Sequence, residues 1–158
     1  MQNLIDIDAA AQKISVRSSS GAIVLLDFRA AFPSMDHGFI WETLQATGLP
    51  ANFIEAIKLL YKDNNHLLRL HGQLFDGPSV HSGVRQGCPL SGILFAICAD
   101  VLLRQIRSRL NGVDEVARAF ADDTAVVVED FFSSLSPLAD LFEEYANISD
   151  TFVACSQR

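Results

Sequence analysis

Two short apolar runs, each next to acidic residues, constrain the fold of this chain most. The run AIVLL at residues 22–26 leads directly into Asp27, and TAVVV at residues 124–128 directly follows Asp122 and Asp123. Runs of this length and composition are typical of buried strands rather than helices. We therefore expect one strand that is buried on both faces and ends at Asp27, and a second that starts from a turn made of two acids.

The remaining periodic segments predict helices and one further hairpin. Helices are expected over residues 3–16, 38–47, 51–63, 89–110 and 137–149, and hairpin arms over 66–70 with 74–80 and over 116–121 with 124–128. Ser136 and Pro137 are expected to cap the last helix, and the second and third helices to cover a sheet. This order indicates a single α+β domain, a mostly antiparallel sheet with helices packed on one face, of the split βαβ (ferredoxin-like) type.

Charge is distributed unevenly along the chain, which has a net charge of −7. Residues 1–112 carry ten basic and nine acidic side chains, whereas residues 113–158 carry two and ten. This balance argues against a stand-alone nucleic-acid binder that is held mainly by phosphate contacts. A polyanion would have to be met by the first part of the chain.

No membrane span, secretory signal or cysteine-based metal site is predicted. The apolar runs are shorter than the ~20 residues that a membrane-spanning helix needs, and no basic stretch leads into an apolar one near the start. The spacing of the three cysteines matches no zinc knuckle, redox pair or disulfide framework, so we expect reduced thiols in the core. The four histidines show no ligand pattern and are expected at the surface or in the hairpin.

The acids are the first candidates for chemistry. If the sheet brings Asp27 close to Asp122 and Asp123, their carboxylates repel, at a cost on the order of 4 kcal/mol for two charges about 4 Å apart at an effective dielectric near 20. A divalent metal is the usual remedy, and Mg²⁺ prefers hard oxygen ligands. Taken alone, each acid is better explained as an ordinary turn or strand-end residue in solvent.

Three strings of residues around these positions are more specific than the acids themselves. They are DFRAAFPS at 27–34, GVRQGCPLS at 83–91 and FADD at 120–123. In order and spacing they resemble motifs A, B and C of the reverse transcriptase palm, most similar to the non-LTR (LINE-like) retrotransposon type. The resemblance covers about residues 20–130. It implies an RNA-directed DNA polymerase, a nucleotidyltransferase that adds deoxynucleotides to a DNA primer on an RNA template by two-metal catalysis.

The resemblance implies a metal site at motifs A and C. Asp27 and Asp122 would be the main ligands of two Mg²⁺ ions, for which Mn²⁺ can substitute, and Asp123 would complete the acidic cluster. The carbonyl of Phe28 would be a further metal ligand and contact to substrate.

The resemblance also implies a nucleotide site at motifs A and B. Phe32 would lie under the incoming deoxynucleotide (dNTP) and reject a ribose 2′-hydroxyl, although its position also suits a core phenylalanine beside a helix start. Gln86 would lie near the nucleotide and template, and Gly87 would let the backbone approach them closely. Arg85 would support these contacts, or else is a solvated loop arginine.

Neighbouring parts of such polymerases have no counterpart in the sequence. Only Lys13 and Arg17 are basic before Asp27, and neither a motif D lysine nor a thumb follows the last helix. We therefore expect a partial reverse transcriptase domain over residues 1–158, a palm with a remnant of the fingers, inactive in isolation and nuclear or cytoplasmic. The alternatives are a non-catalytic interaction domain from a decayed retroelement, whose exposed apolar faces pair with another chain, and a different two-metal nucleotidyl transferase on a similar fold.

Overall fold

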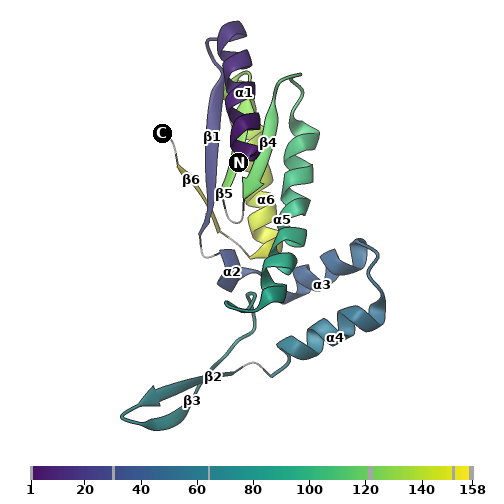
Figure 1. Cartoon of the computed structure of the whole chain (residues 1–158), viewed down its shortest axis with the longest axis vertical. Helices are drawn as coiled ribbons and strands as arrows, with labels where there is room; N and C mark the ends of the chain where they lie inside the picture. Colours follow the sequence, from purple (N-terminus) through teal and green to yellow (C-terminus); the bar gives the residue numbers. More distant parts are fainter. Residues whose placement is uncertain (1, 30, 64, 121–122, 151, 157–158) are drawn as a thin grey trace.

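A four-stranded antiparallel sheet organises the fold (Figure 1). The computed structural model describes residues 2–29, 31–63, 65–120, 123–150 and 152–156, with the backbone alone at 28, 29, 31 and 152–156. In chain order the elements are α1 (Gln2–Arg17), β1 (Ala22–Arg29), α2 (Ala31–Ser34), α3 (His37–Ala46), α4 (Ala51–Tyr61), β2 (Asn65–Leu70), β3 (Gln73–Ser79), α5 (Pro89–Arg109), β4 (Val116–Phe120), β5 (Asp123–Val128), α6 (Phe131–Ser149) and β6 (Phe152–Ser156). The sheet order is β4-β5-β1-β6, and all neighbouring strands are antiparallel. The α+β class predicted from the sequence is confirmed.

Strand β1 buries one face, so the prediction that both faces are buried is wrong. Val24 and Leu26 are buried, whereas Ile23 and Leu25 are 45% and 43% exposed. Side chains alternate along a strand, and the two faces of this sheet are covered unequally. β1 also continues to Arg29, so Asp27 lies within the strand and not at its end.

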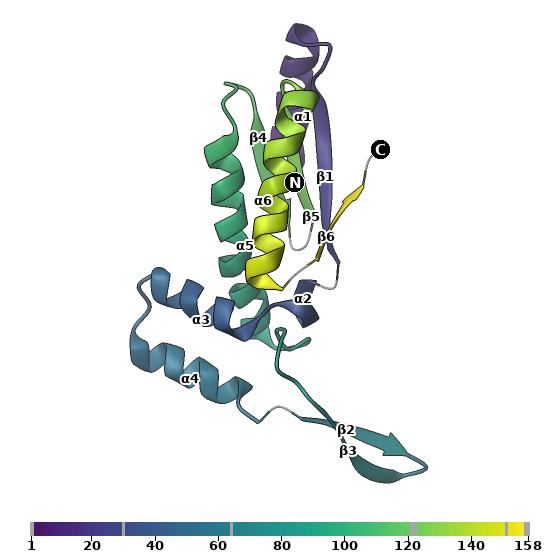
Figure 2. The ribbon, with the colours of Figure 1, turned by 180° about the vertical axis from the view of Figure 1, so that it is seen from behind.

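Helices α5 and α6 cover one face of the sheet (Figure 2). Leu94 and Leu102 of α5 share a core with Leu141 of α6 and with Val126 and Val128 of β5. Among the described helices, α5 is the one that is long and apolar enough to cross a membrane. Its position in this core accounts for that apolar character.

Helix α6 begins six residues earlier than predicted, and Ser136 and Pro137 do not cap it. Asp130 is the N-cap, and its carboxylate accepts a hydrogen bond from the amide of Phe132 at 3.1 Å. Pro137 therefore lies inside the helix, where it lacks an N–H to donate. Burial of Leu138 and Leu141 on the following turn holds this region in helical form.

Helix α1 lies on the other face of the sheet, across β4 and β5 (Figure 1). Its Ala10 and Ile14 form a small core of their own with Val127 of β5. This helix covers only part of the face, which leaves the apolar side chains of Ile23 and Leu25 accessible.

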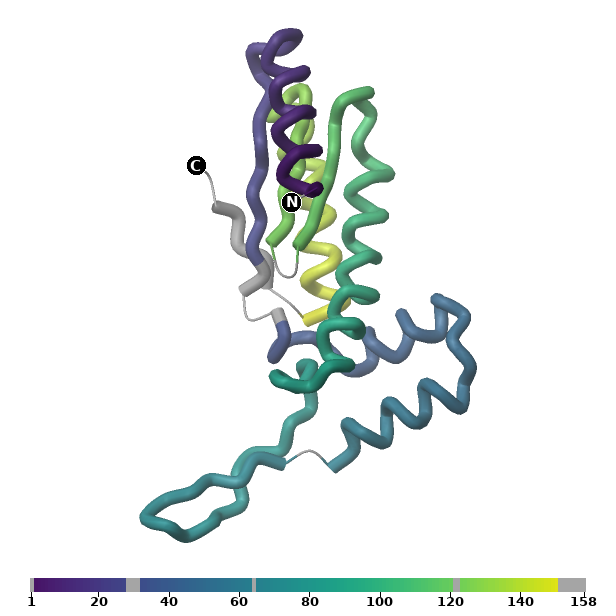
Figure 3. Tube along the Cα trace, viewed as in Figure 1, coloured from purple at the N-terminus to yellow at the C-terminus, as the bar shows by residue number. Residues whose placement is uncertain are grey.

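Helix α3 packs against α5, and α4 packs against α3, instead of covering the sheet, which corrects the prediction for this pair. The face that they were expected to cover is already occupied by α5 and α6. Ile54, Ile57 and Tyr61 of α4 are buried, whereas Phe53 and Leu60 of the same helix are about half exposed. Beyond α4, the β2–β3 hairpin projects from the rest of the molecule (Figure 3).

Candidate functional site

Asp27 and Asp123 are directly opposite each other on β1 and β5. Residues paired in this way have Cα atoms about 4.5–5.5 Å apart and side chains on the same face of the sheet. Both side chains are exposed. The structure thus brings one acid of motif A next to one acid of motif C, whereas Asp122 lies outside the described residues.

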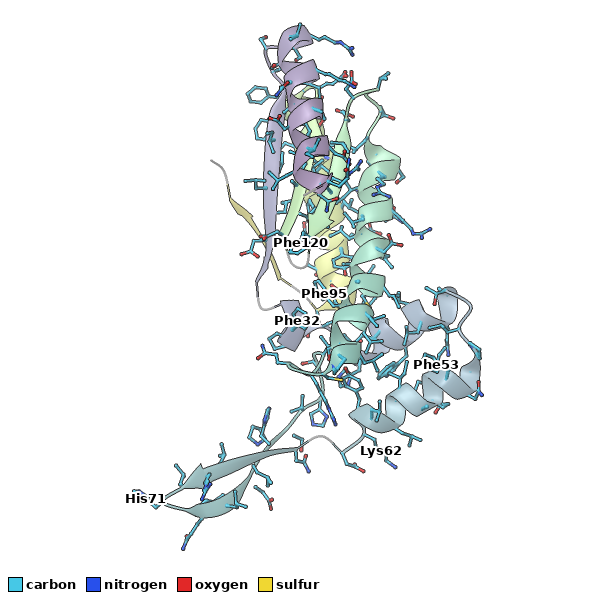
Figure 4. All side chains as sticks on the ribbon, viewed as in Figure 1. Phe32, Phe53, Lys62, His71, Phe95 and Phe120 are labelled. Atoms are coloured by element: carbon cyan, nitrogen blue, oxygen red, sulfur yellow. The ribbon has the colours of Figure 1, made fainter. Side chains whose placement is uncertain are left out.

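The two acids line a cavity of about 870 Å³ on the open face of the sheet. Its walls are mostly apolar and include Ile23 and Leu25 of β1 and Phe120 of β4, which is labelled in Figure 4. A cavity of this size can hold a ligand of nucleotide size.

Polar contacts from α1 fix one wall of this cavity. The side-chain amide of Asn3 donates to the carbonyl oxygen of Ala119 at 2.8 Å, and Arg118 Nε donates to Asp6 Oδ2 at 3.0 Å. The hydrogen bond from Arg118 is the main cause that lowers the pKa of the Asp6 carboxyl below its usual range. The first turn of α1 is therefore held against β4, close to the strand end that precedes Asp123.

Oxygen donors suited to a divalent cation are present at this site. Asp27 and Asp123 supply two opposed carboxylates that face a cavity, which fits the hard oxygen ligands that Mg²⁺ takes. Within the described part of the chain, no cluster of three or more His, Cys, Asp or Glu side chains could hold a metal ion. Phe28 adds a strand carbonyl next to Asp27, and its backbone pairs with Val153 of β6.

Backbone hydrogen bonds join the loop before α5 to the segment after β1. The amide of Gly83 donates to the carbonyl of Met35, and that of Val84 donates to the carbonyl of Phe32, both at 2.7 Å. Gly83 has φ of +84°, and a Cβ there would lie 2.6 Å from the carbonyl oxygen of Pro33. Only glycine fits this contact, which fixes motif B relative to motif A.

The ring of Phe32 stacks on Phe95 of α5, with 5.0 Å between centroids and 16° between planes (Figure 4). Phe32 is half-buried and packs against the main core. It does not line the cavity of Asp27 and Asp123. The core role that the sequence left open is thus present, while one part of the ring stays accessible.

Arg85, Gln86 and Gly87 are exposed in the turn that leads into α5. Gly87 has φ of +83°, a conformation that favours glycine. The guanidinium carbon of Arg85 lies 5.6 Å from the centroid of the Tyr61 ring, a cation–π contact. The Arg85 side chain is thus exposed and at the same time in contact with one aromatic ring.

A cluster of aromatic rings beside motif B was not predicted. His37, expected at the surface, is half-buried between Trp41 and Tyr61, and its Nε2 donates to the carbonyl of Gly83 at 2.9 Å. The spacing of His37 and Trp41, four positions apart on one helix, could have indicated that they share a face. The partner ring on α4 could not be inferred from that spacing.

The sequence is similar to one protein family and to several known proteins. Residues 1–149 match the family model described as reverse transcriptase (RNA-dependent DNA polymerase). The chain is 32% identical over 143 residues to the transposon TX1 uncharacterized 149 kDa protein of Xenopus laevis, covering 86% of this chain and 11% of that protein. It is 36% identical over 112 residues to the Pol polyprotein of the retrotransposable element R2DM of Drosophila melanogaster, covering 68% and 10%.

Solved structures of low sequence identity share the fold. Apo telomerase from Candida tropicalis aligns with a TM-score of 0.74 at 14% identity, over 96% of this chain and 30% of that one. The same telomerase in complex with a fragment of telomeric RNA aligns with a TM-score of 0.72 at 12% identity, over 99% and 30%. The chain spans about a tenth of the length of these curated relatives and about a third of the telomerase chains.

Proposed function

Because this chain belongs to the reverse transcriptase (RNA-dependent DNA polymerase) family, we propose that it is the metal-binding palm of an RNA-directed DNA polymerase. The observation that carries the proposal is the pairing of Asp27 with Asp123 beside a cavity. Residues 1–158 would be a partial domain, a palm with a remnant of the fingers. The substrates would be an RNA template, a DNA primer and deoxynucleoside triphosphates.

In this proposal Asp27, Asp122 and Asp123 hold two divalent ions, Mg²⁺ or Mn²⁺, and the Phe28 carbonyl is a further ligand. Bound ions of this kind activate a primer 3′-hydroxyl and stabilise charge on the leaving pyrophosphate. The contribution of the chain is to hold Asp27 and Asp123 on paired strands, so that the positions of these two residues are set by the strand ladder.

The loop between β3 and α5 would position the nucleotide and template. Gln86 and Gly87 are exposed there, and Gly87 lets the backbone approach a substrate without a Cβ in the way. Arg85 would support this loop through its contact with Tyr61. Phe32 would lie under the sugar, held by Phe95 and by the hydrogen bond from Val84.

Calorimetric titration with Mg²⁺ or Mn²⁺ tests the proposal. We expect the parent chain to bind the ion and the variant with Asp27→Asn and Asp123→Asn to lose binding. A matched control carries Asp8→Asn and Asp76→Asn, which removes two exposed acids elsewhere on the molecule, and should bind like the parent. Equal binding by all three proteins would refute a metal site at the cross-strand pair.

The isolated chain is expected to extend a primer poorly, because its net charge of −7 opposes duplex binding. Primer extension on poly(A)/oligo(dT) with Mg²⁺ measures this directly. Robust synthesis that Asp122→Asn abolishes would contradict the expected inactivity while supporting the metal site.

The second candidate function is a non-catalytic interaction domain, and the projecting β2–β3 hairpin favours it. Leu67, Leu70 and Leu74 are each more than half exposed there, and isolated two-stranded hairpins are marginally stable in water. Absence of metal binding, together with a triple Asp→Asn variant at residues 27, 122 and 123 that is no more stable than the parent, would favour this function over the polymerase.

A further inference from the structure

A second cavity, of about 440 Å³, lies at α3 and α4, away from the acid pair. Three of the residues that line it are aromatic: His37 and Trp41 of α3 and Tyr61 of α4. The Trp41 and Tyr61 rings meet edge to face with centroids 5.8 Å apart, and the His37 and Tyr61 rings do so at 5.2 Å. Tyr61 is buried, whereas His37 and Trp41 are half-buried and keep part of their surface accessible.

Two lysines line the same cavity. Lys62 is exposed just beyond the end of α4, as Figure 4 shows. Lys58 Nζ lies 2.7 Å from Glu55 Oε1, in an ion pair whose side chains are 33% and 64% exposed. Exposed pairs of this kind are weak, so a phosphate can compete with Glu55 for Lys58. A cavity with aromatic rings and lysine ammonium groups suits an unpaired nucleotide of single-stranded nucleic acid.

Hydrogen bonds and ring contacts connect this cavity to the motif B loop. Tyr61 lies under the Arg85 guanidinium, and its hydroxyl is 3.4 Å from the hydroxyl of Ser91 on α5. His37 Nε2 donates to the carbonyl of Gly83. The residues that line the cavity are therefore held by the loop that carries Gln86, the residue expected near the template.

We propose that this cavity binds an unpaired nucleotide of the template strand next to the motif B loop. The base would contact the accessible surfaces of Trp41 and His37, and the phosphates on either side would be met by Lys58 and Lys62. The proposal rests on the proposed polymerase function and adds the place where single-stranded template meets α3 and α4. A base in a duplex is stacked on its neighbours and cannot enter such a site.

Fluorescence tests the proposal, because Trp41 is the only tryptophan in the chain. The full chain is titrated with a uridine RNA decamer in EDTA, which removes divalent ions, so the acid pair takes no part. We expect saturable quenching of Trp41 by the decamer and none by a ten-base-pair RNA duplex. Absence of quenching by the decamer would overturn the proposal.

Variants that remove positive charges distinguish binding at this cavity from nonspecific attraction between cationic side chains and RNA. Lys58→Gln with Lys62→Gln should weaken decamer binding at least tenfold and reduce the slope of log K against log salt by about 1.4, about 0.7 for each phosphate contact with a single strand. Arg104→Gln with Arg107→Gln removes two exposed cations from the far part of α5 and should change affinity less than twofold. Equal weakening in both double variants would show that the cavity is not the binding site.

A further variant distinguishes the failure of this inference from the failure of the proposed function. The chain with Asp27→Asn and Asp123→Asn should quench on decamer binding as the parent does, whatever its metal titration shows. If this variant binds the decamer at least tenfold more tightly than the parent while circular dichroism shows an unchanged fold, the removed carboxylates had repelled the RNA at close range. The RNA is then held at the acid-pair cavity and the inference is wrong.

Discussion

Asp27 and Asp123 occupy paired positions on β1 and β5, so their two carboxylates lie on the same face of the sheet. Without a cation between them, their repulsion destabilises the fold by about 1 kcal/mol or less, because both are exposed.

Replacing one of these acids should therefore raise stability in EDTA and remove stabilisation by metal. In thermal denaturation, Asp123→Asn is expected to melt at or slightly above the parent temperature in EDTA. At Mg²⁺ concentrations ten times its Kd, the parent should gain about 1.4 kcal/mol and the variant should gain little. Equal stabilisation of both proteins by Mg²⁺ would place the metal elsewhere.

The contact between Gly83 and Pro33 predicts a large effect of a single methyl group. Gly83→Ala introduces a Cβ 2.6 Å from a carbonyl oxygen at a positive φ, and should destabilise the fold by about 2–4 kcal/mol in urea denaturation. Gly48→Ala is the matched control, since Gly48 also has a positive φ, +79°, but open space around it. It should cost about 1 kcal/mol. If the two variants lose similar amounts of unfolding free energy, the positive φ alone accounts for the effect, and the close contact between motif A and motif B contributes nothing to it.

Local sequence signals predicted most of the elements, but not α2, β6, the first six residues of α6 or how the elements pack. Gly48, with its positive φ, ends α3 near the expected place, and the hairpin around Gly72 formed as predicted. The placement of α3 and α4 failed because an apolar stripe shows that a helix is buried, not against which partner. Burial of β1 was overestimated for the same reason, since the run at residues 22–26 looks alike whether one face or both are covered.

The loss of folding stability at acidic pH should depend on the contact between α1 and β4. A hydrogen bond from Arg118 lowers the pKa of Asp6 in the folded chain below its ordinary value of 3.8. The folded state therefore gains stability from this carboxylate above that pH, and loses it as pH falls through the lowered value. Asp6→Asn should be less stable than the parent at pH 7, and the difference should shrink as the pH falls below 3.8 and through the lowered pKa.

Urea denaturation at pH 7 and at pH 2.5 to 3 measures this difference. Asp8→Asn serves as the control, because the Asp8 carboxylate accepts a hydrogen bond from Gln12 of the same helix and does not contact β4. If Asp6→Asn and the parent differ by the same amount at both pH values, the pair contributes nothing to the pH dependence.

The candidate site shows a similar division between what sequence predicts and what it leaves out. The strings at motifs A, B and C made Asp27, Asp123 and Gln86 candidates, because each motif needs a particular residue type at a particular spacing. The rings of His37, Trp41 and Tyr61 form no such string, since they come from two helices that meet only in the fold.

Cysteine reactivity should report the packing of α5 against its neighbours. Cys98 is fully buried, and burial raises the pKa of its thiol to about 12, so almost no thiolate is present near pH 8. In a variant with Cys88→Ser and Cys155→Ser, iodoacetamide at pH 8 should leave the folded chain unlabelled and modify Cys98 completely in urea. The rate of labelling across a urea series, followed by mass spectrometry, should track global unfolding measured by circular dichroism. Labelling in the absence of urea at the rate of an exposed thiol would mean that the core between α5 and α6 opens in the native state, which the burial of Leu94 and Leu102 beside it argues against.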